Sequence, residues 1–152
     1  MFGFVFQAVS LIPTMNAFEN VEFSLRMAGI SENRKERVEE CLRRVGLAGR
    51  MRHMPAEMSG GEQQRVSIAR ALAKNPKILL CDEPTGALDY QTGKSILKLL
   101  QDTCHKKGKT VVVITHNLAI APMADRVIEM KNGKISNITI NEHPQPVETI
   151  EW

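Results

Sequence analysis

The stretch from residue 58 to residue 89, MSGGEQQRVSIARALAKNPKILLCDEPTGALD, restricts the possible folds more than any other part of the chain. The segment Ser59–Gly61 precedes apolar residues at helical spacing, so we expect a helix over about 62–74, which the dipeptide at 75–76, Asn-Pro, ends. Backbone N–H groups at such a helix start bind anions, because they have no partner within the helix and the helix dipole adds positive potential.

A short apolar run follows this helix, and two carboxylates come directly after the run. The sequence ILLC at 78–81 is typical of a strand buried on both faces of a sheet. Asp82 and Glu83 then lie where the strand ends, and ligands of open α/β sheets gather at the carboxyl ends of strands. An Asp in this place suits Mg²⁺, and a Glu beside it suits activation of a water molecule.

Five short motifs resemble those of ATP-binding-cassette (ABC) ATPases. MSGGEQQR resembles the family's signature motif, and ILLCDEPT resembles its Walker B strand. GALD is similar to the D-loop, ITH at 114–116 to the His switch, and FVFQ at 4–7 to the Q-loop. Five motifs in the family's order are far more specific than any one, and the resemblance extends to about residue 134. The chain looks most similar to exporter ATPases of the macrolide-efflux and lipoprotein-release type, which serve separate membrane permeases.

The resemblance implies an α/β fold, namely a partial RecA-like P-loop NTPase core with a parallel sheet plus an α-helical subdomain. We expect the ATPase domain over residues 1–140, with the helical subdomain over about 14–57 and a polar, extended tail over 141–152. A C-terminal strand is expected to pair through the Asn132-Gly133 turn. The predicted parallel strands are residues 2–6, 78–82, 110–115 and 126–130.

Two helices are expected in the helical subdomain. Thr14 or Asn16 is predicted to cap the first, and Ser31 is predicted to cap the second. The second carries an apolar stripe at helical spacing, which predicts a buried face. The stripe consists of Val38, Cys41, Leu42 and Val45.

In the family, these motifs build a composite nucleotide site between two subunits that meet head to tail. The resemblance therefore implies ATP and Mg²⁺ as cofactors. Asp82 and Gln7 would hold Mg²⁺, Glu83 would be the general base, and His116 would contact the γ-phosphate. The residues implied in nucleotide binding and in the subunit interface are Ser59, Gly60, Gly61, Glu62, Gln7 and Asp89. Glu62 stands where Gln is commoner and places an acid near the phosphate, which the helix dipole offsets.

No phosphate-binding loop of the form G-x-x-x-x-G-K-[ST] occurs in the 152 residues. The segment at 93–95, GKS, has the right ending, but Leu88 stands where the first Gly is required. The segment at 108–110, GKT, fails because Thr103 takes that position. Because the P-loop grips the phosphates and helps to hold Mg²⁺, we expect the isolated chain to be inactive. In the family this missing segment also supplies a strand, so we expect a gap between the third and fourth predicted strands, with unpaired edges.

Composition narrows the class of protein further. The net charge of +3 comes from 20 basic and 17 acidic residues without a basic cluster, so we expect no nucleic-acid partner. Cys41, Cys81 and Cys104 show no pairing pattern and predict reduced thiols in or near the core. No apolar run reaches the roughly 18–20 residues of a membrane span, and residues 1–13 lack the basic start of a signal peptide. We expect residues 2–6 to form a buried strand, and the protein to lie peripherally on the cytoplasmic face of the cell membrane.

Three functions fit these features. The first is the ATP-binding subunit of an ABC transporter, which couples ATP hydrolysis to export through a separate permease and pairs with a second ATPase subunit. The second is a non-catalytic, truncated dimerisation module that lends its signature motif to an intact partner, and the missing P-loop favours this function for the isolated chain. The third is a chromosome-maintenance or repair ATPase, but such proteins need long coiled coils, and no sustained heptads lie between Gln7 and Ser59.

Overall fold

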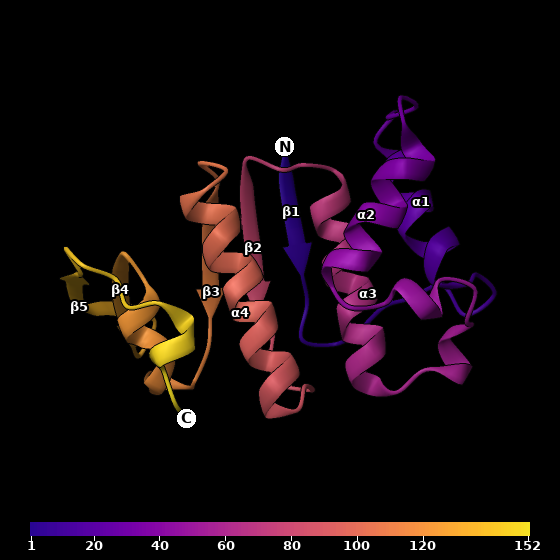
Figure 1. The fold of residues 1–152 in the computed structure, drawn as a ribbon. Coiled ribbons are helices and arrows are strands. Elements are labelled where there is room, and N and C mark those ends of the chain that lie inside the picture. The colour runs from indigo at the N-terminus through magenta and orange to yellow at the C-terminus, as the bar shows by residue number, and fades with distance from the viewer.

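Three parallel strands, adjacent in the order β1-β2-β3, form the centre of the computed structural model, which describes residues 1–152 (Figure 1). They are Phe2–Val5 (β1), Ile78–Asp82 (β2) and Thr110–Ile114 (β3). Helix α3, Gly60–Ala73, precedes β2, and helix α4, Tyr90–His105, precedes β3. Parallel neighbours require a crossover, so each helix runs back against the strand direction. The carboxyl ends of the strands and the starts of α3 and α4 therefore lie at the same end of the molecule, the lower end in Figure 1.

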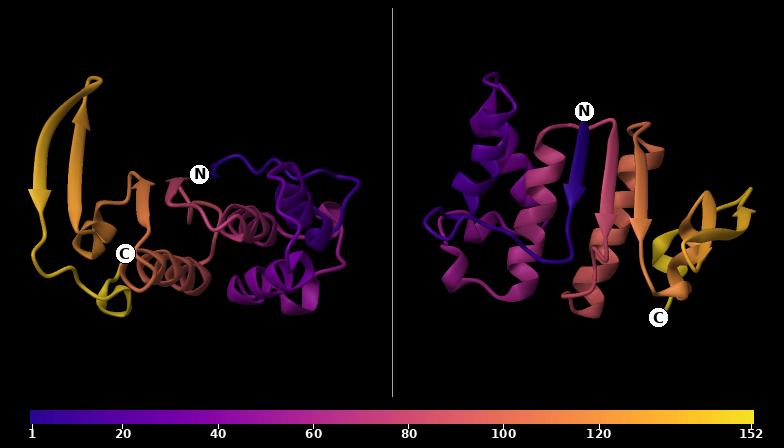
Figure 2. Two further views of the ribbon diagram at one scale, coloured as in Figure 1. Left: turned by 90° about the horizontal axis from the view of Figure 1, so that it is seen from above. Right: turned by 180° about the vertical axis from the view of Figure 1, so that it is seen from behind.

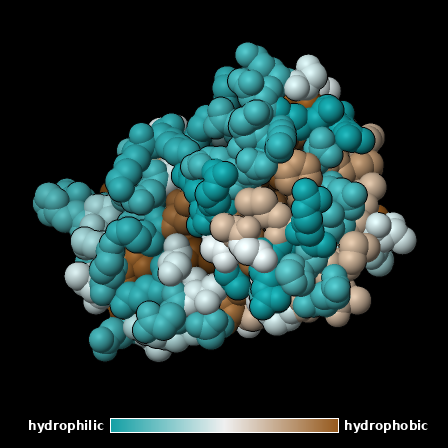
Figure 3. Space-filling view, turned by 45° about the vertical axis from the view of Figure 1, so that its right-hand side comes forward, coloured by the Kyte–Doolittle hydropathy of each residue, from teal (hydrophilic) through white to brown (hydrophobic).

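A helical lobe lies beside this sheet and packs on α3. It contains α1, Ala17–Met27, and α2, Arg34–Arg44, both in contact with α3, and two short 3₁₀ helices, Ala48–Arg50 (η1) and Pro55–Glu57 (η2). The predicted apolar stripe of α2 is buried, as its spacing indicated. Figure 3 shows the side on which this lobe comes forward, where hydrophilic residues cover much of the surface.

The two predicted helix caps had different outcomes. Asn16 caps α1 in a capping box: its Oδ1 accepts the N–H of Glu19 at 2.8 Å, and the Glu19 carboxylate accepts the N–H of Asn16 at 2.8 Å. The predicted cap at Ser31 is wrong. Asn33 precedes α2 instead, with φ of 48° and no capping hydrogen bond from its side chain. Asn tolerates this left-handed conformation, which delays the start of the helix.

Only one face of the parallel sheet is covered. Helices α3 and α4 lie on one side of it (Figure 2), where Val5, Leu79 and Cys81 are buried. The prediction that the strands are buried on both faces is therefore wrong. Phe2–Val5 do form the predicted first strand, but only one of its faces is buried. The large apolar side chains exposed on the other face or beside it are Phe2, Phe4, Phe6, Val112 and Ile114. The three Phe rings stack in sequence, with centroids 6.4 and 5.8 Å apart.

The parallel sheet has three strands rather than the four predicted. The fourth candidate, Arg126–Lys131 (β4), pairs only with Lys134–Ile140 (β5), in an antiparallel hairpin that stands apart from the sheet (Figure 2). The Asn132-Gly133 turn closes this hairpin as predicted, with positive φ at both residues. The fourth strand was expected across a gap from β3, so no strand of the chain is its neighbour in the sheet. The connection from β3 to β4 contains the short 3₁₀ helix Leu118–Met123 (η3). The outer edge of β3 stays unpaired, at the position of the predicted gap.

The tail beyond residue 140 is less extended than predicted. It forms a 3₁₀ turn, Val147–Thr149 (η4), that packs on α4. Val147 and Ile150 are buried, and the ring of Trp152 lies 5.0 Å from that of Tyr90. Apolar residues spaced between the polar ones supply this contact: Val147 packs with Leu97 of α4, while the polar residues beside it stay in water.

The cysteines agree with the prediction of free thiols in or near the core. Cys41 and Cys81 are buried, Cys104 is half-buried, and none forms a disulfide. Burial raises the pKa of the Cys81 thiol to about 12, so this side chain behaves as an inert core residue. None of the helices combines the length and apolar character needed to cross a membrane.

The buried stripe of α2 yields a stability prediction. Leu42 is fully buried in the core that α2 shares with α3, so Leu42→Ala removes packing that the lobe cannot recover. We expect the free energy of unfolding to fall by about 2–5 kcal/mol. Met27→Ala is the control, since Met27 is 71% exposed and should change stability by less than about 0.5 kcal/mol. Urea unfolding followed by circular dichroism compares the two, and equal small losses would show that the lobe does not pack as described.

Candidate functional site

Glu83 is fixed between the ends of two adjacent parallel strands. It follows the last residue of β2, and its N–H donates to the carbonyl of Ile114 at 2.9 Å, which extends the ladder between β2 and β3. One carboxylate oxygen accepts the hydroxyl of Thr115 at 3.1 Å, and the other accepts the backbone N–H of His116 at 2.7 Å. The structure thus brings Glu83 and the His-switch segment into direct contact.

The backbone at Glu83 is unusual for a residue with a side chain. Its φ is +44°, in the left-handed region that non-glycine residues rarely occupy. The carbonyl of Glu83 accepts the N–H of Gly86 at 3.1 Å, so the chain turns sharply directly after β2. Such strain is found where the surroundings hold a functional group in place, and here the bonds from residues 115 and 116 do so.

Asp82 and Gln7 lie on neighbouring strand ends. Asp82 is the exposed last residue of β2, and β1 pairs in parallel with β2 up to the pair of Val5 with Cys81. Gln7, two residues beyond Val5, is also exposed. A carboxylate and an amide oxygen at one sheet end are the kind of ligand that Mg²⁺ takes, so these residues fit that ion.

The start of α3 is stabilised by a capping box. Ser59 Oγ accepts the N–H of Glu62 at 3.1 Å, and the Glu62 carboxylate accepts the N–H of Ser59 at 2.8 Å. The guanidinium of Arg50 lies 3.3 Å from the other Glu62 oxygen. The hydrogen bond from the Ser59 backbone lowers the pKa of Glu62, and Arg50 lowers it further. The acid that seemed out of place beside a phosphate is therefore paired and serves as part of the helix cap.

The two glycines of the signature segment have different surroundings. A Cβ added at Gly60 would meet no atom within 4 Å, so the backbone there is open to a ligand. A Cβ added at Gly61 would lie 3.3 Å from the carbonyl oxygen of Ala87 and 3.4 Å from a methyl group of Leu88. Gly61 therefore lets the signature segment approach the D-loop segment closely. The open N–H groups of this helix start fit a phosphate.

Asp89 begins α4 in the same way that Ser59 begins α3. Its side chain accepts the N–H of Thr92 at 3.0 Å, and hydrogen bonds from Thr92 lower the pKa of the Asp89 carboxylate. Asp89 is fully exposed, so it remains available to a partner surface.

The supporting roles of two residues were not predicted from the sequence. Thr115 orients Glu83 and also accepts the N–H of Asn117 at 3.0 Å. Gln64 is buried inside α3, and its Nε2 donates to the carbonyl of Phe6 at 3.4 Å, which joins the signature helix to the Q-loop. In the sequence, the only signals for these roles were a hydroxyl directly after an apolar strand, for Thr115, and a Gln within the buried face of a helix, for Gln64. Neither signal reveals the distant partner, because Glu83 and Phe6 each lie more than thirty residues away in the chain.

No hydrogen bond joins the start of α3 to the strand-end group. The structure places the two groups at the same end of the molecule, but as separate units: the strand ends with Gln7, Asp82, Glu83 and His116, and the helix start with Ser59, Gly60, Gly61 and Glu62.

Comparisons with known proteins extend these observations. The family model described as ABC transporter matches residues 1–86. The chain is 50% identical over 138 residues to the uncharacterized ABC transporter ATP-binding protein MJ0796 of Methanocaldococcus jannaschii, across 88% of this chain and 59% of that protein. It is 45% identical over 150 residues to the macrolide export ATP-binding/permease protein MacB of Shewanella sp. (strain ANA-3), across 98% of this chain and 22% of MacB.

A solved structure is also similar to this one. The dimeric structure of MJ0796 in a post-hydrolysis state, bound to ADP and Pi, matches with a TM-score of 0.86 and 44% sequence identity. The match covers 93% of this chain and 63% of the MJ0796 chain. This chain therefore spans less than two thirds of the length of these relatives.

The pairing of Glu62 yields a pH-dependent prediction. The folded-state pKa of Glu62 is lowered from the ordinary 4.5, so its charge stabilises the fold above that pH and stops doing so as the pH falls through the folded-state value. Glu62→Gln keeps the size and the hydrogen-bond acceptor but removes the charge. We expect this variant to be less stable by about 0.3–1 kcal/mol at neutral pH, with the difference vanishing in acid. Thermal unfolding of both proteins across pH measures it, and a difference that stays constant into acid would contradict the assignment.

Proposed function

This chain belongs to the ABC transporter family, and we propose that it acts as the ATP-binding subunit of an exporter, coupling ATP hydrolysis to transport through a separate membrane permease. The matches to MacB and MJ0796 agree with the macrolide-efflux type of resemblance predicted from the motifs. The observation that best supports a hydrolytic role is the Glu83 carboxylate, fixed by Thr115 and by the backbone of His116 where two parallel strands end.

Glu83 has the geometry of a general base for the attacking water. An ionised carboxylate offers about four lone-pair sites, and the two observed hydrogen bonds occupy two of them. The remaining sites can take a proton from water while the carboxylate keeps its orientation. Bound ATP with Mg²⁺ would supply the phosphoryl group and neutralise its charge. Asp82 and Gln7 would hold the ion, and the exposed ring of His116 would contact the γ-phosphate.

The signature segment would bind the nucleotide of a second subunit. Ser59 Oγ uses an acceptor site for the N–H of Glu62, so its own O–H proton remains free to donate to a phosphate oxygen. The N–H groups of Gly60 and Gly61 stand at the positive end of the α3 dipole. A head-to-tail dimer would use both features, and Asp89 would line its interface. The dimeric state of the similar MJ0796 structure supports this arrangement.

The proposed permease sets the location of the subunit. We place it on the cytoplasmic face of the cell membrane as a peripheral protein. Within the chain, the helical lobe and the loop after β1 form one unit suited to transmit a signal, since the buried Asn20 of α1 hydrogen-bonds that loop. Its side chain accepts the N–H of Ile12 at 2.8 Å and donates to the carbonyl of Met15 at 2.9 Å. The name of the MacB relative joins ATP binding and a permease in one protein, which supports association with a permease but not a separate permease subunit.

A second function is favoured by one observation, the absence of a Walker A motif from the 152 residues. The chain would then be a non-catalytic dimerisation module that lends its signature segment to an intact partner. The capped start of α3 and its close approach to the D-loop segment are the parts that this function needs.

Both functions leave the 152 residues without a P-loop, so a test of ATP hydrolysis by the purified chain asks whether other groups can replace it. We expect the chain alone to turn over ATP no faster than its Glu83→Gln variant, because the backbone amides and Lys of a P-loop supply most of the phosphate binding. Release of inorganic phosphate with ATP and Mg²⁺ measures the rate. Turnover that Glu83→Gln abolishes would show that the chain holds the phosphates by other groups and would reject the non-catalytic function.

The signature segment should still act on a partner. We expect ATP to promote association of this chain with full-length MJ0796 in its ATP-bound form, because a ligand stabilises the state that binds it. Ser59→Arg should abolish the ATP-dependent part, since it places bulk where a phosphate would lie. Ser136→Arg is the matched control, as Ser136 lies on the exposed β5 strand.

Analytical ultracentrifugation with and without ATP measures this association. If ATP has no effect, or if Ser59→Arg and Ser136→Arg behave alike, the signature segment does not bind nucleotide across an interface.

A further inference from the structure

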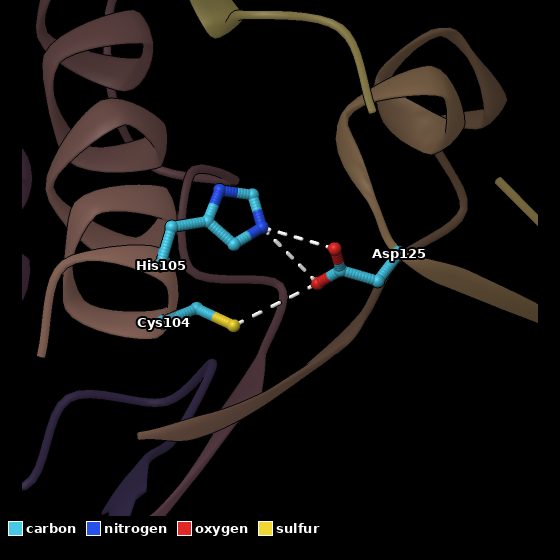
Figure 4. Close-up of side chains that lie close together, drawn as sticks. All are labelled: Cys104, His105 and Asp125. Atoms are coloured by element: carbon cyan, nitrogen blue, oxygen red, sulfur yellow. Dashed lines mark hydrogen bonds and ion pairs between the residues drawn. The ribbon is translucent and has the colours of Figure 1, made fainter. Parts of the chain in front are cut away.

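Three side chains with metal-binding atoms meet at the far end of α4, away from the strand ends described above. Cys104 and His105 are the last two residues of α4, and Asp125 directly precedes β4 (Figure 4). His105 Nε2 lies 3.0 and 3.2 Å from the two Asp125 carboxylate oxygens, and Cys104 Sγ lies 3.7 Å from one of them. The sulfur, nitrogen and oxygen atoms all lie within 4.8 Å of one another.

This spacing fits a tetrahedral metal site. Zn–S bonds of about 2.3 Å and Zn–N or Zn–O bonds of about 2.0–2.1 Å place neighbouring ligand atoms about 3.3–3.7 Å apart. Two of the three ligand pairs are already close to this separation. Thiolate and imidazole ligands select zinc-like ions, whereas Mg²⁺ prefers oxygen ligands. The cluster therefore differs in chemistry from the Asp82 group.

Hydrogen bonds hold both sides of the cluster of Cys104, His105 and Asp125 in place. The carbonyl of Asp125 accepts the N–H of Asn141 at 2.9 Å, and the side chain of Asn141 donates to the carbonyl of Ala124 at 2.7 Å. On α4, Gln101 donates to the carbonyl of Met123 at 3.2 Å and so joins the helix to the segment before Asp125. Such preorganisation reduces the conformational entropy that metal binding would cost.

The surroundings also favour a cation. The cluster lies at the C-terminal end of α4, where the helix dipole gives negative potential. The side chains of His105 and Asp125 are 42% and 60% exposed, so an ion can enter and a water molecule can take a fourth position.

We propose that Cys104, His105 and Asp125 bind one zinc-like divalent ion, with water as the fourth ligand. The ion would fasten the end of α4 to the start of the β4–β5 hairpin, which pairs with no other strand. It would act as a structural clip between the body of the protein and the hairpin, independently of nucleotide.

The test uses the full 152-residue chain, stripped of metal with a chelator and then titrated with Zn²⁺ in a calorimeter. We expect one ion per chain and a rise in the melting temperature with Zn²⁺, because the ion binds the folded state. Cys104→Ser and His105→Asn should each weaken binding by at least roughly 10-fold, since even outer-shell partners contribute about that much. His53→Asn is the matched control, as His53 lies in the helical lobe and should leave binding unchanged.

A second measurement uses Co²⁺ in place of Zn²⁺ and the unaltered chain, so it does not depend on the folding of any variant. A Co²⁺ complex of the unaltered chain should show a sulfur-to-cobalt charge-transfer band in the near ultraviolet. Absence of that band, absence of Zn²⁺ binding, or equal binding by Cys104→Ser would overturn the proposal and leave His105 and Asp125 as a hydrogen-bonded pair only.

Discussion

The parallel pairing of β1, β2 and β3 is the constraint on which the rest of the structure depends. Parallel neighbours cannot be joined by a tight turn, so α3 and α4 must return along the sheet before β2 and β3 begin. That return brings both helix starts to the carboxyl ends of the strands. Gln7, Asp82 and His116 are separated by long stretches of sequence, yet this topology places them at one end of the molecule. The starts of α3 and α4 and the strand-end side chains thus lie at the same end of the molecule, where ligands of open α/β sheets gather.

Local hydrogen bonds then set the chemistry at that end. Glu83 occupies a left-handed conformation that costs free energy, and the bonds from Thr115 and the His116 backbone hold it there. Glu62 shows how a charge can serve the fold at a helix start. Its carboxylate completes the cap of α3 and pairs with Arg50.

The helices cover only one face of the parallel sheet, and the β4–β5 hairpin stands apart from that sheet. Parallel sheets are normally covered on both faces, but the helices here cover only one, and Phe2, Phe4 and Ile114 stay exposed on the other. The edge of β3 has no partner, and β4 pairs with β5 alone. The similar MJ0796 chain is longer, and this chain matches 63% of it. A protein that leaves this much apolar surface and an open strand edge is expected to associate readily with itself or with a covering segment.

The sequence by itself determined the family, the types of the elements and the identity of the strand-end residues, because motifs, helical spacing and the Asn132-Gly133 turn are local signals. It also predicted the gap beside β3 and the buried stripe of α2. The sequence did not determine which faces of the strands are buried. The ILLC run has the same composition whether one face of the sheet or both are covered, so only the placement of the helices decided the burial. The tertiary structure also decided the bonds of Thr115 to Glu83 and of Gln64 to Phe6, and the meeting of Cys104 and His105 with Asp125. Each of these contacts joins residues distant in the chain, and a single sequence carries no signal for such distances.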